Sequence, residues 1–230
     1  MQPVRGAVTA LGLALAAGAL LPQAARAGCD DPPGPRMNWS GCAKQQLMLR
    51  GERFGGARLD RAVLNSIDFS SSDFTGSSFV AAEFNRSSFR EAKLGGANFS
   101  KAYAVRSNFT GARMDAANLE KAEIHRSNFT GAFLNGANLS KGDFGRSVFD
   151  RAEMAGVNLR SSNLGRASFL GARLTGADFS RSFTFGMHIE GTDLSAVKGL
   201  TQEQLDAACG DAKTRLPAGL APSKSWPCAE

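Results

Sequence analysis

The four cysteines are the residues best placed to do chemistry. Cys29 and Cys42 lie near the N-terminal end, Cys209 and Cys228 lie near the C-terminal end, and none lies between them. In an oxidising compartment four cysteines permit three pairings, of which we favour the local pairing within each end; reduced cysteines are the alternative. A zinc site is less favoured, because the spacings are not short Cys-x-x-Cys pairs and no histidine accompanies them. We expect no metal and no cofactor.

Residues for acid–base or nucleophilic catalysis are scarce. The only histidines are His125 and His188, and we expect each to be a solvated surface residue. The chain contains no nucleophile elbow, phosphate loop or paired zinc motif. Of its aromatic residues, 16 are Phe, against 1 Tyr and 2 Trp, which suits dry packing better than ligand chemistry. We therefore expect a non-enzymatic protein without a small-molecule substrate.

Residues 1–27 have the three parts of a secretory signal peptide. Arg5 precedes an apolar stretch over residues 7–21, and Ala25-Arg26-Ala27 has the pattern of a cleavage site. The apolar stretch is short for a membrane span, and nothing later resembles one, so we expect no transmembrane segment. The sequence therefore predicts an exported protein, periplasmic or secreted.

Processing of this segment changes the charge little. Cleavage removes Arg5 and Arg26 and no acidic residue, which lowers the formal net charge from +6 to +4. Lipidation at Cys29 is an alternative to simple cleavage, but Arg26 stands where a lipoprotein signal usually has Leu. All four cysteines remain in the mature chain.

Between the cysteine-containing ends the chain repeats every five residues. From Leu49 to Leu194 in steps of five there are thirty positions, and only Ala104 and Thr184 among them are not Leu, Phe, Met or Ile. Two residues before these central positions, twenty-four of thirty residues are Ala, Ser or Gly. Five residues fit neither a 3.6-residue helix nor a two-residue strand. The chain must turn a corner every five residues, with one small and one large side chain pointing inward on each side.

A second period of twenty residues indicates that four five-residue units make one coil. Residues 106–112 recur without change at 126–132. At intervals of twenty, an inward column contains Phe69, Phe89, Phe109, Phe129, Phe149 and Phe169. At strand spacing, ~4.8 Å per coil, about 7.5 coils give a rod about 36 Å long.

This pattern resembles the pentapeptide-repeat family, whose consensus is A(D/N)LXX, over residues 47–196. The resemblance implies an all-β fold, a right-handed quadrilateral β-helix of about 7.5 coils, and says more about shape than about activity. We divide the chain into a signal peptide (1–27), an N-terminal cap (28–46), the β-helix (47–196) and a C-terminal cap (197–230). Caps are needed because terminal coils otherwise expose apolar surface and unpaired strand edges.

The C-terminal cap contains the signature of a short helix. Thr201 and Gln204 have the spacing of a capping box, and Gly210 has the character of a helix stop. We predict a helix near residues 202–209, whose apolar residues cover the last coil. A bond between Cys209 and Cys228 would hold this cap.

Two of the four corner columns are basic, and they flank a single face. One corner column contains Lys101, Lys121, Lys141 and Arg181, and the next contains Arg86, Arg106, Arg126, Arg146 and Arg166. The other two corner columns are rich in Gly. We hypothesise that this face binds an extended anion, such as an envelope polysaccharide, a phosphate-bearing glycolipid or an acidic protein. The alternative is a solvated or internally paired column, because Glu83, Glu123 and Asp143 lie between the corners.

A second candidate surface is apolar. Phe133, Phe183 and Phe185 lie outside the inward series, and the last two bracket Thr184. Phe183 and Phe185 mark either a packing irregularity beneath the cap or an exposed self-association patch, for example in a homodimer.

The leading class of function is an exported structural or interaction protein with an unknown protein or anionic envelope partner. The resemblance also implies the alternative of a DNA mimic that protects topoisomerases from quinolones, but a mimic needs an acidic surface and a cytoplasmic target. Direct nucleic-acid binding is not expected, because the strip has few outward aromatic residues and no known reading motif. An enzyme is the least favoured class.

Overall fold

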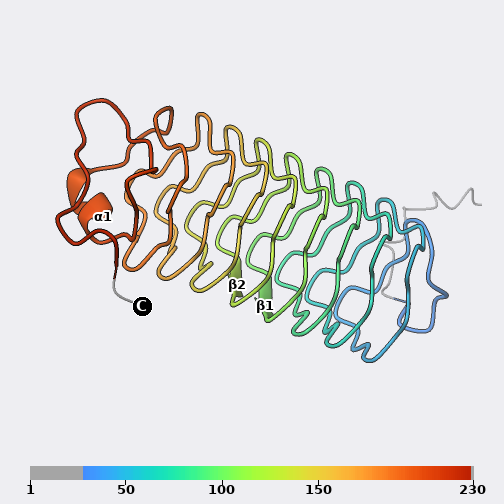
Figure 1. Ribbon diagram of the computed structural model, residues 1–230. Coiled ribbons are helices and arrows are strands. Elements are labelled where there is room, and N and C mark those ends of the chain that lie inside the picture. The colour runs from blue at the N-terminus through green and yellow to red at the C-terminus, as the bar shows by residue number, and fades with distance from the viewer. Residues whose placement is uncertain (1–27, 229–230) are drawn as a thin grey trace, which may run out of the picture.

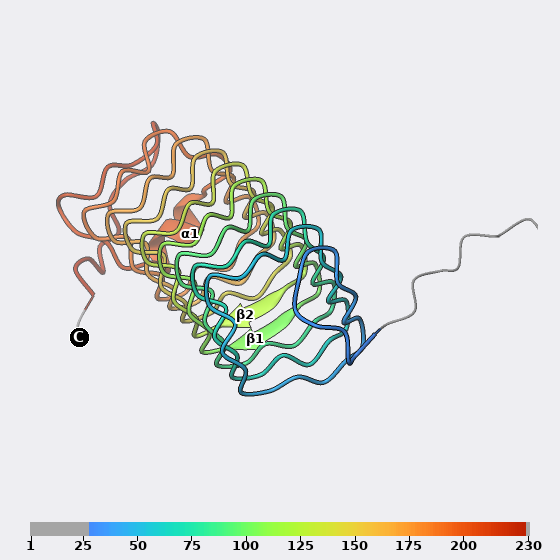
Figure 2. The same cartoon turned by 90° about the vertical axis from the view of Figure 1, so that its right-hand side faces the viewer.

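The computed structural model describes residues 28–228, which form a rod of stacked coils (Figure 1). The predicted signal peptide, residues 1–27, lies outside the described residues. Turned by 90°, the rod shows its coils one behind another, each bending at regular corners (Figure 2). This confirms the predicted all-β solenoid.

The corners are β-turns that each require a left-handed residue. Residues with positive φ recur at every fifth position, for example Arg106 at 58° and Gly111 at 66°. After most of these residues the next N–H closes the turn, as when Ala112 N–H donates to the Phe109 carbonyl at 3.0 Å, whereas after Arg106 the Ser107 N–H donates to Ser127 Oγ. A positive φ at the third turn residue is the requirement of a type II turn, and Gly meets it at the least steric cost. The Gly-rich corner columns therefore follow from the backbone.

Adjacent coils are joined by parallel backbone hydrogen bonds. Phe109 N–H donates to the Asn128 carbonyl at 2.7 Å, and Asn128 N–H donates to the Ser107 carbonyl at 3.0 Å. Most coil contacts are isolated parallel bridges, from Asn38 with Arg58 to Asp193 with Arg215. Within residues 28–228, two strands are long enough to name: β1, Tyr103–Val105, pairs in parallel with β2, Glu123–His125.

The core contains the inward phenylalanine column that the twenty-residue period predicts. Successive rings from Phe69 to Phe169 stack with centroids 4.7 to 5.1 Å apart. Offset stacking in a dry interior is favourable for rings without polar atoms. The small position two residues before each central residue is also buried, which leaves room for the stack.

Serine replaces alanine at several of these small positions without leaving a polar group unpaired. Ser107 Oγ donates to the Phe84 carbonyl at 2.6 Å, and Ser127 Oγ accepts from Ser107 N–H at 3.1 Å. Buried hydroxyls therefore link neighbouring coils, and each bond offsets the cost of taking a polar atom out of water.

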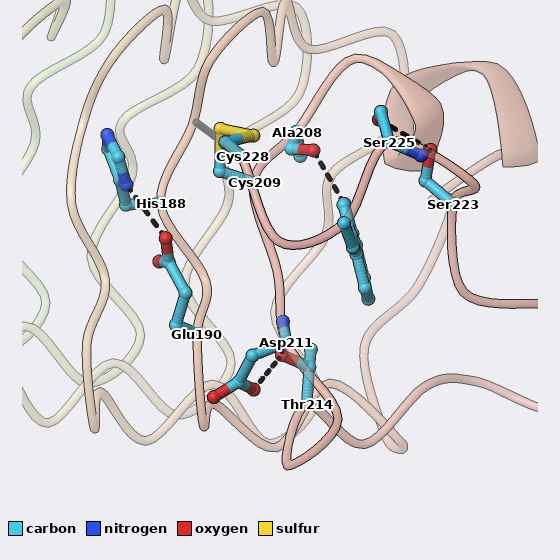
Figure 3. Close-up of a disulfide and its surroundings, with 10 residues drawn as sticks. His188, Glu190, Ala208, Cys209, Asp211, Thr214, Ser223, Ser225 and Cys228 are labelled. Atoms are coloured by element: carbon cyan, nitrogen blue, oxygen red, sulfur yellow. Dashed lines mark hydrogen bonds and ion pairs between the residues drawn. A yellow bond between two sulfur atoms is a disulfide. The ribbon is translucent and has the colours of Figure 1, made fainter. Parts of the chain in front are cut away.

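Each end contains the local disulfide favoured from the sequence. Cys29 is bonded to Cys42, and Cys209 is bonded to Cys228. At the N-terminal end, Trp39 is 1% exposed and donates from Nε1 to the Asp31 carbonyl at 3.1 Å. At the C-terminal end, Trp226 Nε1 donates to the carbonyl of Ala208, the residue before Cys209 of the second disulfide, at 2.7 Å (Figure 3).

The C-terminal helix forms, but it is shorter than predicted. Helix α1 spans Gln202–Asp206, with the predicted capping box between Thr201 and Gln204 and with Ala207 at its C-cap. The prediction of an end near residue 209 at Gly210 is wrong, because Cys209 rejoins the ladder and bridges in parallel to His188. Gly210 instead lies under the ring of Trp226, where an added Cβ would approach Cη2 to 2.5 Å. Ring packing, and not helix termination, explains this glycine.

Carboxylates connect the last coils to the residues that follow α1. Asp211 accepts from the Gly191 N–H at 2.9 Å and from the Thr214 hydroxyl at 3.0 Å (Figure 3). These bonds, with that from Gly191 the strongest cause, lower the pKa of Asp211 against the opposing effect of desolvation. The hydroxyl and N–H of Ser195 likewise lower the pKa of Asp193.

We predict that removing the cap disulfide destabilises the rod. The bond between Cys209 and Cys228 closes a separation of 19 residues, for which chain entropy gives about 3 kcal/mol. The double variant Cys209→Ser/Cys228→Ser should lose about that much free energy of unfolding in a denaturant titration without reductant. An unchanged midpoint would show that the cap is held by packing alone.

We also predict a loss of stability in acid that Asp193 and Asp211 help to cause. A carboxyl whose pKa is lowered on folding stabilises the fold above its unfolded pKa, and this contribution disappears as the pH falls through the folded pKa. The melting temperature should therefore hold near neutral pH and fall below about pH 4, near the unfolded value. In Asp193→Asn/Asp211→Asn the acid-induced fall, measured by thermal unfolding at several pH values, should be smaller. The same fall in both proteins would contradict this assignment.

Candidate binding face

The two basic corner columns border one side of the rod. We call this side the basic face: it carries β1 and β2, the lysine-rich corner before them and the arginine corner after them. All eight predicted basic residues are exposed and have positive φ, namely Arg86, Lys101, Arg106, Lys121, Arg126, Lys141, Arg146 and Arg166. Their side chains therefore start from turn tips and project away from the core.

The arginine column has no ion-pair partner within residues 28–228. Its five members are absent from the salt bridges of the described chain, although Glu83, Glu123 and Asp143 lie on the same face. Of the three lysines, Lys141 pairs with Glu120 at 2.9 Å. The hydrogen bond from this ammonium group lowers the pKa of Glu120. The arginine side chains keep their donors available to another molecule.

Three of these arginines surround a pocket, which we call the glycine pocket. Its volume is about 300 Å³. It is lined by His125, Arg126, Asp143, Gly145, Arg146, Asn163, Gly165, Arg166, Phe183 and Phe185. The structure thus brings together the arginine column and the phenylalanine pair, which are separate candidates in the sequence.

A second hollow lies further toward the N-terminal end of the same face. It has a volume of about 380 Å³ and includes Arg86, Arg106 and Tyr103 in its lining. Between the hollows, the rings of Tyr103 and His125 meet edge to face with centroids 6.1 Å apart. Lys101, Lys121 and Lys141 line neither hollow, so the arginine side of the face has the more defined shape.

Phe183 and Phe185 are exposed beside the C-terminal cap. Their exposed fractions are 57% and 56%, and their rings lie 6.4 Å apart at an interplanar angle of 25°. Between them Thr184 is buried and donates to the Gln204 carbonyl at 2.7 Å. Met187 is also buried, at a position that is usually small. The irregular packing and the exposed pair therefore occur together.

The glycine pocket has a signal that the sequence analysis did not use. The residue just before each corner arginine forms its own column: Asn85, Val105, His125, Gly145 and Gly165. Gly145 and Gly165, which lie in consecutive coils, leave this column without side chains there, and the pocket lies over them. A search at twenty-residue intervals of this position, as well as of the corner position, would have located the gap.

Within the described residues, no group of three or more His, Cys, Asp or Glu side chains is placed to hold a metal ion. None of the helices in residues 28–228 is long and apolar enough to cross a membrane. His188 is exposed and its Nδ1 lies 3.0 Å from Glu190 Oε1 (Figure 3).

A model of pentapeptide repeats matches the chain in eight copies, over residues 53–90, 82–120, 92–136, 127–165 and 152–183. The chain belongs to the pentapeptide-repeat family. This match covers more than half of the chain, and the stacked coils agree with it. No curated protein matches the chain.

Several solved structures of pentapeptide-repeat proteins are similar. HetL from the cyanobacterium Nostoc, involved in regulating heterocyst differentiation, is 23% identical over 81% of this chain and 93% of its own, with a TM-score of 0.36. The plasmid-mediated fluoroquinolone resistance protein QnrB1 is 19% identical over 76% of this chain and 92% of its own, with a TM-score of 0.37. A protein from the Arabidopsis thaliana thylakoid lumen is 25% identical over 59% and 67%, with a TM-score of 0.15. These superpositions are too loose to carry an argument about function.

Proposed function

We propose that this protein is an exported, non-enzymatic scaffold that binds an acidic partner through the basic face. The observation that carries the proposal is the column of five exposed arginines without ion pairs in the described chain. At one arginine per coil, the like charges recur every ~4.8 Å and repel one another. An extended anion relieves this repulsion and satisfies the guanidinium donors.

The backbone does not account for the choice of arginine. Positive φ favours Gly and, among other residues, Asn or Asp, so arginine has no conformational advantage at these corners. Duplication of whole coils is also an incomplete explanation. The preceding residue changes from Asn85 to Val105, His125 and Gly145 while the arginine is retained in each coil.

Export supports an envelope or extracellular partner. The signal-like pattern of residues 1–27 and the two disulfides favour an oxidising compartment, periplasmic or extracellular. An oxidising compartment disfavours a topoisomerase-directed DNA mimic, which needs a cytoplasmic target. The charge also disfavours it, since a mimic must present negative charge and this face presents positive charge. Few aromatic residues are exposed along the arginines, which also disfavours single-stranded nucleic acid.

We predict that a triple substitution in the arginine column weakens binding to an anionic polymer. Arg106→Ser/Arg126→Ser/Arg146→Ser should keep the fold and reduce the affinity for polyglutamate by about tenfold at low salt, at roughly 0.5 kcal/mol per exposed pair. Fluorescence titration at two salt concentrations measures the loss and its salt dependence.

A charge-matched variant is the control. Arg36→Ser/Arg113→Ser/Arg151→Ser removes three exposed arginines outside the basic face. It should bind nearly as the parent protein does. Equal losses in the two triple variants would mean that only net charge matters, and the proposed function would be withdrawn.

A further inference from the structure

The glycine pocket is more than a gap between arginines, because its floor depends on two glycines that the backbone does not require. Gly145 and Gly165 are not among the glycines with positive φ, and the same turn position holds Asn85 in an earlier coil of this column, while Val105 and His125 lie in β1 and β2. A side chain is therefore compatible with this backbone position. The glycines serve to leave space.

That space is tight enough to be removed by small side chains. A Cβ at Gly165 would lie 3.0 Å from Phe183 Cε1, and a Cβ at Gly145 would lie 3.1 Å from Asp143 Oδ1. The floor's own polar groups are satisfied: Asp143 Oδ1 accepts from Gly145 N–H at 2.9 Å and from Asn163 Nδ2 at 3.0 Å. The floor thus contributes space for a side chain, while the Asp143 carboxylate disfavours an anionic group at this place.

The walls of the pocket have two different chemistries. The guanidinium groups of Arg126, Arg146 and Arg166 line the arginine corner, and the rings of Phe183 and Phe185 stand at the C-terminal end. A ligand that fits must carry negative charge along one side and an apolar ring that reaches the two phenylalanines. A polyuronate or a polyphosphate supplies the charge but no ring side chain.

The length of the face also fits a short extended peptide. From the coil of Arg86 to that of Phe185 there are five coil steps, or ~24 Å. An extended chain covers this distance with about seven residues at ~3.3 Å each. The pocket volume of about 300 Å³ is at the lower limit of ligand sites and suits one large side chain.

A second copy of this protein is a poorer occupant. Arg166 lines the glycine pocket, and Arg181 lines the hollow on the cap side of the same phenylalanine pair. A symmetric dimer centred on Phe183 and Phe185 would bring these like charges together, and Asp143 and Glu203, which line the same two hollows, would have to pair with them to offset the cost.

We propose that an acidic polypeptide segment of about seven residues lies along the basic face and inserts one aromatic side chain into the glycine pocket, against Phe183 and Phe185. This inference rests on the proposed function and specifies its partner. The carboxylates pair with the arginine column, and the aromatic side chain fixes the position of the segment along the rod. Specificity for the position along the rod then comes from the aromatic ring, and the long-range attraction comes from the carboxylates.

The test measures binding of synthetic peptides to the purified, oxidised protein by fluorescence anisotropy. The probes are two seven-residue peptides of Asp and Glu, one with a single Trp at its N-terminal end and one with a single Trp at its C-terminal end. Each has a matched peptide with Ser in place of Trp. Polyglutamate, polygalacturonate and polyphosphate serve as anions without a ring. One of the two Trp peptides should bind about tenfold more tightly than its Ser counterpart, the advantage expected of a buried aromatic contact.

Variants that fill the pocket or remove its phenylalanine rings separate the contribution of the aromatic side chain to peptide binding from that of the charge. Gly145→Val introduces the residue present at position 105 and keeps every charge, so it should abolish the Trp advantage and leave binding of the Ser peptide unchanged. Phe183→Ser/Phe185→Ser should do the same. The matched control is Gly95→Val, which makes the same substitution at the same turn position on the diagonally opposite corner, where the nearest atom is 4.0 Å from the added Cβ. Circular dichroism and melting temperature verify that each variant folds.

The outcomes distinguish the two proposals. Equal binding of the Trp and Ser peptides, or a Trp advantage that survives Gly145→Val, overturns the inference and leaves the proposed function standing. Binding of polygalacturonate or polyphosphate in preference to every peptide also overturns the inference and assigns another anionic partner. Concentration-dependent self-association that Phe183→Ser/Phe185→Ser abolishes would assign the patch to a second copy and overturn the inference. Failure of all anions to bind overturns both.

Discussion

Backbone hydrogen bonds between residues about twenty positions apart are the interaction on which this structure depends. Each coil bonds to the coils before and after it: Asn128 bonds to Ser107 and Phe109 of the preceding coil, and Phe129 N–H donates to the Val148 carbonyl of the following coil at 2.7 Å. These bonds fix the coil at four turns of five residues, and every turn then needs one residue with positive φ. Shortening or lengthening a coil by one residue would exchange inward and outward positions, as a register slip does in any strand.

This register determines which side chains share one surface of the rod. A side chain repeated every twenty residues stands directly above its equivalents, so phenylalanine becomes a stack inside and arginine becomes a charged column outside. The core and the face are therefore consequences of the same constraint. A gap in a column is also informative, because two successive glycines at positions 145 and 165 open a pocket between otherwise regular coils. The rod provides both a repeated charge and one place where the repeat is interrupted.

The sequence predicted the fold because the period is long and nearly unbroken, and local rules decide each turn. The capping box at Thr201 could likewise be predicted from the sequence. The end of α1 was not, because Cys209 returns to the ladder and the ring of Trp226 occupies the space above Gly210, which are contacts between distant residues. The glycine pocket was missed for a related reason: it joins the arginine column to Phe183 and Phe185, and that junction exists only once coils are placed in three dimensions.

Chemical footprinting of arginine tests most directly whether one face of the rod is the binding surface. The protein is treated with phenylglyoxal with and without polyglutamate, and modification is mapped residue by residue by mass spectrometry. We predict protection of the column on the basic face, comprising Arg86, Arg106, Arg126, Arg146 and Arg166, while Arg36, Arg113 and Arg151 remain as reactive as in the free protein. Protection spread evenly over all exposed arginines, or absent from the column, would contradict the account.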